Sequence, residues 1–178
     1  ARPQMLSPLR RVQLFVVLAT LVAFSPIFTA TWQVEWDDGA NFLNHDAWRG
    51  LGSAQLTWMW THSWMGHFQP LSWMSLGLDY NLWGLDPRPY HVENVLLHAA
   101  SAALLVSLLG RLVPRAGAAG WLAGGLFFAI HPLRVESVAW ITERRDVLSM
   151  LLALGALRAW LVWVEGRRAW GFALAVAL

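Results

Sequence analysis

The stretch HVENVLLHAASAALLVSLLGRL, from His91 to Leu112, decides the fold. It is mostly apolar and long enough for a transmembrane helix, which needs about twenty residues. The whole chain of 178 residues is 57% hydrophobic and only 13% charged, whereas charged side chains make up about a quarter of a soluble globule. Its thirteen tryptophans suit the interface between bilayer and water. The sequence therefore predicts an all-α, polytopic membrane helical bundle.

Further apolar runs lie on both sides of this stretch. We expect spans at about 12–30, 91–112, 116–132 and 146–164, a truncated run at 169–178 and an outer loop at 31–90. The last run is about half of what a crossing needs, so the chain is expected to be a fragment of a longer protein. Within the outer loop, the apolar pattern predicts two short amphipathic helices in the outer interface, although its period also fits ordinary core helices.

The third run is short for a crossing, because its apolar part from Ala116 to Ile130 gives about 23 Å of helix against a hydrocarbon core of about 30 Å. Two arrangements remain open at this point. Either the helix continues through His131 and Pro132, or the polar segment that follows lies below the headgroups and lines a cavity.

The placement of arginine predicts the orientation of the spans. Three groups fall on one side if the spans alternate: Arg10 and Arg11, Arg111 and Arg115, and Arg167 and Arg168. The positive-inside rule makes that side cytoplasmic, so the N-terminus is expected inside and the segments around 37–38 and 131–145 outside. All thirteen basic residues are arginine, which is typical of a GC-rich bacterial genome, and we expect a bacterial inner membrane.

Composition also limits the chemistry. There is no cysteine, so disulfides and thiolate metal sites are excluded. A net charge of only +2 gives no reason to expect a nucleic-acid partner.

Two adjacent carboxylates, Asp37 and Asp38, follow the first apolar span. Buried charges must be paired or neutralised, so these acids are either simply hydrated or held for chemistry. Asp-Asp-Gly is also a good turn or helix N-cap. The pair alone does not distinguish between the two interpretations.

A second polar group follows the third apolar run. It comprises His131, Arg134, Glu136, Glu143, Arg144, Arg145 and Asp146. One interpretation is a structural ion-pair network that caps the fourth span. The other is an anion site, because the guanidinium fork matches phosphate.

Three polar residues at helical spacing, His91, Asn94 and His98, share one face of the second span. Such faces usually form hydrogen bonds between helices, and we expect that role for His98. His91 lies near the outer end and could reach a ligand. His67, three residues before the turn-forming Pro70, says little by itself.

Taken in order, the motifs resemble the GT-C membrane glycosyltransferases, most closely the transmembrane O-mannosyltransferases with tetratricopeptide repeats and their bacterial relatives. The blocks are WDD at 36–38, HFQPL at 67–71, GLDPRPYHVENVLLH at 84–98, FAIHPLRVESVA at 128–139 and ERRDVL at 143–148. The resemblance spans about 32–160, which is the N-terminal end of such an enzyme, and includes no tetratricopeptide repeat. Where these proteins usually have a second histidine or a threonine after His-Pro, this chain has Arg134, a departure that can mean a different donor head group or acceptor.

The resemblance implies an outward-facing site in the first long loop, an acidic base and a polyprenyl-phosphate-linked sugar as donor. Asp37 or Asp38 would take the proton of a hydroxyl acceptor, either protein Ser/Thr or a glycan, with inversion at the sugar. Arginines would balance the growing phosphate charge, and the aromatic interface helices would hold the isoprenoid chain among membrane lipids. The expected phosphate-binding residues are Arg134, Arg144, Arg145, His131 and His67, supported by Glu136, Glu143, Asp146, His91 and Asn94.

Acid pairs can also bind Mg²⁺ or Mn²⁺. Binding of a divalent metal therefore stays an open alternative, and no residue is assigned as a metal ligand.

Two other classes of protein also stay open. A fragment of a lipid or solute transporter or flippase would place arginines and acids at membrane depth as well, and a non-catalytic membrane scaffold would need no acids at its outer mouth. The fragment alone is expected to be inactive.

Overall fold

The computed structural model describes residues 6–166 and 168–178, and these residues form helices joined by short turns. No β-strand occurs among them, and the nearest approach to one is an isolated bridge between Trp64 and His67. The predicted all-α class is therefore confirmed. Arg167, one of the arginines used to predict orientation, lies outside the described residues.

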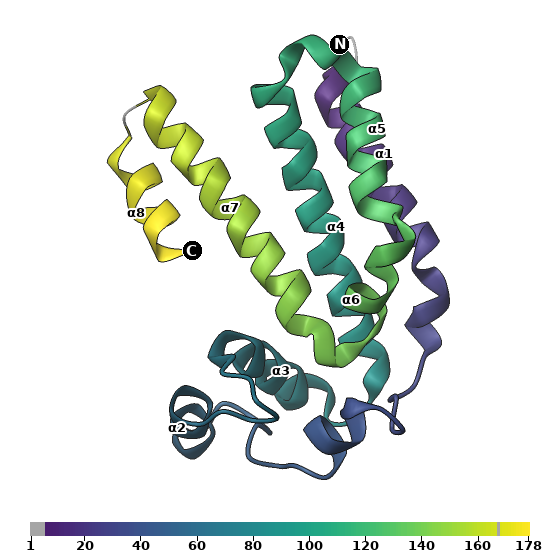
Figure 1. The fold of residues 1–178 in the computed structure, drawn as a ribbon, viewed down its shortest axis with the longest axis vertical. Helices are drawn as coiled ribbons and strands as arrows, with labels where there is room; N and C mark the ends of the chain where they lie inside the picture. The colour runs from purple at the N-terminus through teal and green to yellow at the C-terminus, as the bar shows by residue number, and fades with distance from the viewer. Residues whose placement is uncertain (1–5, 167) are drawn as a thin grey trace, which may run out of the picture.

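Three helices stand side by side in the bundle: α1 (Pro8–Ala23), α4 (Pro87–Leu112) and α5 (Gly117–Ile130). α7 (Arg144–Gly166) packs on α4 and diverges from the other helices towards its C-terminus, where α8 (Ala169–Ala177) folds back along it (Figure 1). By length and apolar composition, α4 and the segment that contains α7 can each cross a membrane.

The first predicted span, 12–30, is divided in the structure. α1 begins at Pro8, before the predicted start, and ends at Ala23, after which Ser25–Thr29 forms a 3₁₀-helix. Pro26 explains the break, because proline has no N–H to continue the helical hydrogen bonds and its ring clashes with the preceding turn.

The third predicted span is broken at its proline, where the chain bends. α5 ends at Ile130, and the axis of Pro114–Ile130 meets that of Pro132–Ala139 at 47°. The second part is a 3₁₀ turn, Pro132–Arg134, followed by the short helix α6 (Val135–Ala139). Counted as one bent span, this pair is a third segment that can cross a membrane.

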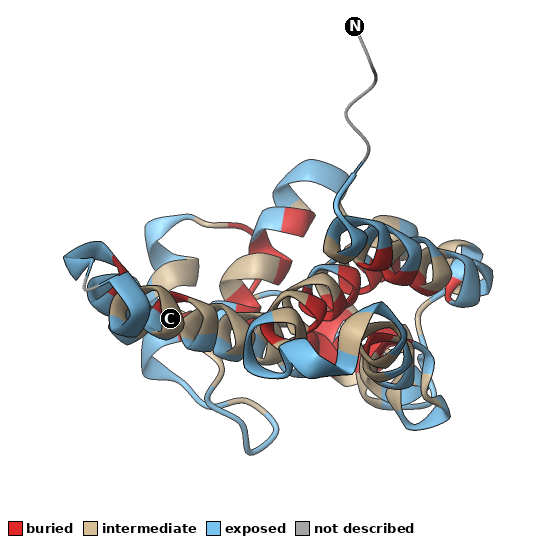
Figure 2. Cartoon of the chain, turned by 90° about the horizontal axis from the view of Figure 1, so that it is seen from above, coloured by how far each residue is buried: buried red, intermediate tan, exposed pale blue. Residues whose placement is uncertain are grey.

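Close packing holds α1, α4 and α5 together. A Cβ built on Gly125 of α5 would lie 2.6 Å from Val106 of α4 and 3.0 Å from Val16 of α1. Glycine is therefore required there for close contact between the helices. Figure 2 shows the buried residues on the inward faces of the helices and the exposed ones outside.

The outer segment contains the two predicted helices, α2 (Ser53–Thr61) and α3 (Pro70–Trp83), and a π-helical turn at Gly39–Leu43. Its core joins seven buried residues: Phe42, Trp48, Met59, Trp73, Leu76, Tyr90 and Ile141. Tyr90 belongs to α4 and Ile141 directly precedes α7, so this aromatic core fixes the outer segment to the end of the bundle.

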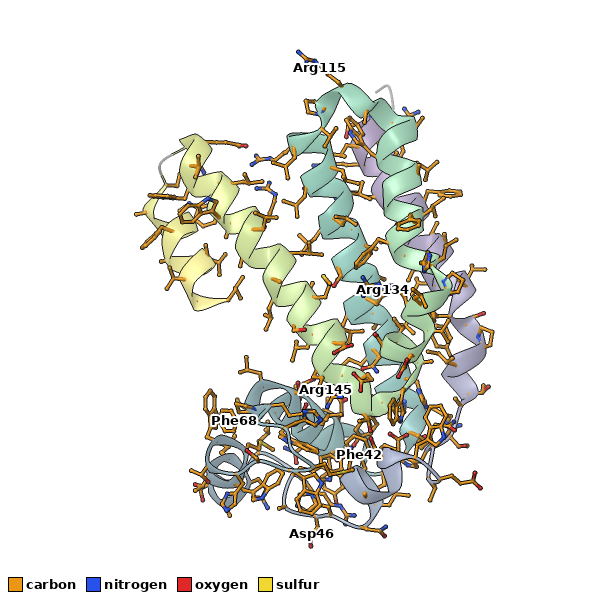
Figure 3. The ribbon with its side chains drawn as sticks, in the orientation of Figure 1. Phe42, Asp46, Phe68, Arg115, Arg134 and Arg145 are labelled. Atoms are coloured by element: carbon orange, nitrogen blue, oxygen red, sulfur yellow. The ribbon has the colours of Figure 1, made fainter. Side chains whose placement is uncertain are left out.

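The remaining described arginines that predict orientation gather at the opposite end. The same end of the molecule holds the N-terminus of α1, the turn between α4 and α5 and, set apart from them, the C-terminus of α7 (Figure 1). Arg115 marks that end in Figure 3. Arg111 of α4 pairs with Glu165 of α7 at 2.7 Å. Spans that alternate across a bilayer would bring these residues together in this way.

A labelling experiment tests the orientation. Asp46 in the outer segment and Arg115 at the other end are both exposed, so cysteine at either position can react. We expect an impermeant thiol reagent added outside intact cells to label Asp46→Cys and to spare Arg115→Cys. The reverse pattern would invert the proposed topology. Gly39 is less suitable, since a Cβ there would lie 2.8 Å from the carbonyl oxygen of Val34.

Candidate functional site

The two adjacent carboxylates have different environments. Asp38 is 0% exposed, and each of its oxygens accepts a hydrogen bond: from the Thr142 hydroxyl at 2.8 Å and from the backbone N–H of Gln33 at 2.9 Å. Burial raises the pKa of Asp38, and these hydrogen bonds oppose the rise. Asn41 donates to the same Thr142 hydroxyl at 3.2 Å. Asp38 therefore connects the outer segment to the turn before α7.

Asp37 is only half-buried, and among the described residues its carboxylate has no hydrogen-bond or ion-pair partner. The preceding residue, Trp36, packs edge-to-face on Trp140 with ring centres 5.2 Å apart. The backbone around Asp37 is thus held by Trp36 and Asp38, while its own side chain stays available to another molecule.

A cavity of about 580 Å³, here called the outer cavity, lies beside this segment. Its size is within the range of small-molecule sites. It is lined by Ile27, Ala30, Gln33, Trp36, His91, Pro132, Leu133, Val135, Glu136, Ala139 and Trp140. Two of the predicted supporting residues, His91 and Glu136, therefore come together at this cavity.

Arg144 is the centre of a buried polar network. Its side chain is 0% exposed and pairs with Asp79 of α3 at 2.9 Å and with Glu93 of α4 at 3.1 Å. It also donates to the Ser75 hydroxyl at 2.8 Å, to the Asn94 side-chain oxygen and to the backbone oxygen of Tyr90. These contacts join α3, α4 and α7 at one point, as the structural ion-pair interpretation predicts.

If Asp79 and Glu93 were both ionised, they would carry two negative charges beside the single positive charge of Arg144. Burial and the neighbouring Glu93 raise the pKa of Asp79 from 3.8 to about 8, while Arg144 opposes the rise. The raised pKa favours the protonated form of Asp79, which lowers the excess of negative charge around Arg144.

The other predicted charges near α7 make local contacts. Arg145 pairs with Glu143 at 2.5 Å, and its side chain remains 28% exposed. Asp146 accepts a hydrogen bond from the Ser137 hydroxyl of α6 at 3.1 Å. Arg134 lies apart from Arg145, on the turn between α5 and α6 (Figure 3).

Arg134 and His131 face a second cavity of about 520 Å³, here called the lipid-side groove, with Leu105, Gly124, Phe127, Phe128 and Leu133. The Arg134 guanidinium lies 5.0 Å from the centre of the Phe128 ring, and among the described residues no carboxylate pairs with it. An apolar groove that also contains an arginine side chain fits a lipid that carries an anionic head.

His67 does not join the other predicted phosphate-binding residues. It is exposed and bonds through its backbone to Trp64 in a tight turn. Its neighbour Phe68 lies at the edge of the outer segment, far from Arg134 in Figure 3. His98, in contrast, has the predicted role, because its Nε2 donates to the carbonyl oxygen of Ala129 on α5 at 2.9 Å.

Sequence reasoning missed four residues that shape the site: Thr142, Asp79, Glu93 and Trp140. Asp79 was the most accessible to prediction, because it is a charge within the apolar pattern of α3. Thr142 and Trp140 gave no signal, since their roles depend on partners about a hundred positions away in the chain. Within the described part of the chain, no three His, Asp or Glu side chains form a group that could hold a metal ion.

Comparison with known proteins finds relatives that match part of the chain. The chain is 43% identical over 91 residues to protein O-mannosyl-transferase tmtc2 of Xenopus laevis, covering 51% of this chain and 10% of the relative. It is 37% identical to TMTC2 of Homo sapiens, over 62% of this chain and 14% of the relative. For Tmtc1 of Drosophila melanogaster the identity is 34%, over 65% of this chain and 12% of the relative.

No protein-family model matches the chain, and no solved structure matches it. The chain spans only between 10% and 14% of the length of these three curated relatives. Over the matched residues, the chain is similar to the TMTC protein O-mannosyl-transferases, and this confirms the resemblance that its ordered motifs indicate.

Proposed function

We propose that this chain is the N-terminal part of a membrane glycosyltransferase that moves a sugar from a polyprenyl-phosphate donor to a hydroxyl group. The names of its relatives favour a mannose donor and a protein Ser/Thr acceptor. One structural observation carries the proposal: Asp37 has an unpaired, half-exposed carboxylate, directly after Trp36 of the outer-cavity wall, on a backbone fixed by the buried Asp38.

In this mechanism Asp37 is the general base. It takes the proton of the acceptor hydroxyl as that oxygen bonds to the anomeric carbon of the sugar. The bond from this carbon to the phosphate oxygen breaks at the same time, and the electron pair leaves with the polyprenyl phosphate. Attack and departure occur on opposite faces, so the sugar is inverted and no glycosyl-enzyme intermediate forms. A phosphate leaving group needs no general acid, but it does need cations.

Arg134 and His131 are the proposed phosphate ligands. Their cavity is apolar elsewhere and can receive the first isoprene units of the donor. Arg145, which is partly exposed, remains a second cation that can approach the phosphate. Arg144 is reassigned to a positioning role, because its guanidinium is wholly buried and already faces five protein acceptors.

Replacing Arg134 tests the phosphate assignment. A hydrogen bond to a charged group contributes about 1.5–3 kcal/mol, so Arg134→Gln in the full-length protein should raise the donor KM or lower kcat about tenfold to a hundredfold. Arg115→Gln, at the opposite end of the bundle, is the matched control and should leave both constants unchanged. Equal kinetics for the two variants would remove Arg134 from the donor site.

A further inference from the structure

We propose that the outer cavity binds the sugar ring of the donor, with His91 and Trp140 as the residues that recognise its hydroxyl groups. This inference rests on the proposed function and deepens it, because it assigns the sugar and the phosphate to two separate cavities. His91 and Trp140 would then act as specificity-determining residues.

Unpaired nitrogen atoms at the cavity wall are the first evidence. His91 is 1% exposed, and neither of its ring nitrogens has a hydrogen-bond partner in the described chain. The backbone of Thr31 and Ala139 lies next to the ring, but without normal hydrogen-bond geometry. The indole nitrogen of Trp140 is also buried without a partner. Leaving such groups unpaired is unfavourable, and ligand hydroxyls that reach this wall would supply the missing hydrogen bonds.

The charge of the cavity indicates a neutral ligand. Glu136 is the charged residue among those that line it, and no arginine does. A carboxylate repels phosphate but accepts hydrogen bonds from hydroxyl groups. Gln33 adds both a donor and an acceptor, and the rings of Trp36 and Trp140 offer apolar surface for the C–H groups of a sugar.

The position of the two cavities is the third observation. Leu133 lines both the outer cavity and the lipid-side groove. A single donor can therefore place its sugar on one side of the turn at 132–134 and its phosphate, with the isoprenoid chain, on the other. The anomeric carbon would lie between the two cavities.

The test measures binding rather than transfer. Full-length protein in nanodiscs would be titrated with polyprenyl-phosphate hexose and, separately, with polyprenyl phosphate that carries no sugar. His91→Phe removes both ring nitrogens, so it should weaken binding of the sugar-bearing lipid about fivefold to a hundredfold and leave the sugarless lipid unchanged. Trp140→Phe, which removes one N–H and keeps an aromatic ring, should act in the same direction with a smaller effect.

His98→Phe is the matched control, because His98 is a buried histidine of the same helix that does not line the cavity. It should leave the preference for the sugar-bearing lipid intact, and melting curves identify any variant that fails to fold. If His91→Phe and Trp140→Phe weaken both lipids equally, or neither, the cavity does not hold the sugar. If the unaltered protein binds neither lipid, the proposed function fails as well.

Discussion

Asp37→Asn in the full-length protein is expected to lower glycosyl transfer by at least about a hundredfold, since a general base contributes about 10²–10⁴-fold. The amide has the same shape, and the carboxylate it replaces has no partner among the described residues, so the fold should be unaffected. Binding of the lipid-linked sugar should also persist. Initial rates with a Ser/Thr peptide, measured beside donor binding, check both expectations.

Substitutions of two neighbouring carboxylates give the comparison: one should leave transfer unchanged, and the other should impair both the fold and transfer. Glu35 is exposed, and Glu35→Gln should transfer sugar at the normal rate. Asp38→Asn replaces an acceptor oxygen by an amide NH₂ group next to existing donors, so it should lower the melting temperature as well as the rate. If Asp37→Asn and Asp38→Asn both keep normal transfer, the acidic pair is only a hydrated turn and the proposed mechanism is wrong.

Arg144→Gln is expected to cause the largest loss of stability. The substitution leaves Asp79 and Glu93 without their cation, and breaking a buried pair in this way costs about 3–5 kcal/mol. Because the network joins α3 to α4 and α7, the outer segment should lose its attachment to the bundle first. Thermal unfolding of the full-length protein in detergent, followed by tryptophan fluorescence, measures the loss.

Arg145→Gln is the neighbouring control. Arg145 is partly exposed and pairs with a single carboxylate, so its loss should change the free energy of unfolding by less than about 1 kcal/mol. Normal melting of Arg144→Gln together with a raised donor KM would instead return Arg144 to the phosphate site.

The helices were predictable because local rules determine them. Apolar length identified the spans around α4 and α7, and the apolar pattern within the outer loop identified two short helices, which are α2 and α3 in the structure. Proline then shifted the boundaries: Pro26 ends α1 early, and α5 ends just before Pro132, where the chain bends by 47° into the next segment. A sequence shows that a proline interrupts a helix, but the packing around it decides whether the chain stops or bends.

The candidate site was less predictable, because spacing along one helix says nothing about contacts between helices. The run Glu143-Arg144-Arg145-Asp146 shows four charges in a row, yet one is buried among distant partners and the others bond locally. The sequence left both interpretations of these arginines open. Only the approach of α3 to α7 distinguishes Arg144 from Arg145, and nothing in the local sequence specifies it.

The stereochemistry of transfer tests the central claim most directly. Purified full-length protein would receive a polyprenyl-phosphate hexose of known anomeric configuration and a Ser/Thr peptide, and the glycopeptide would be analysed by NMR. The account predicts a sugar linked to the peptide hydroxyl with the opposite configuration. A product with retained configuration would contradict a single displacement assisted by Asp37. Absence of transfer, with lipid or sugar moved across the membrane instead, would contradict the transferase itself and favour a transporter.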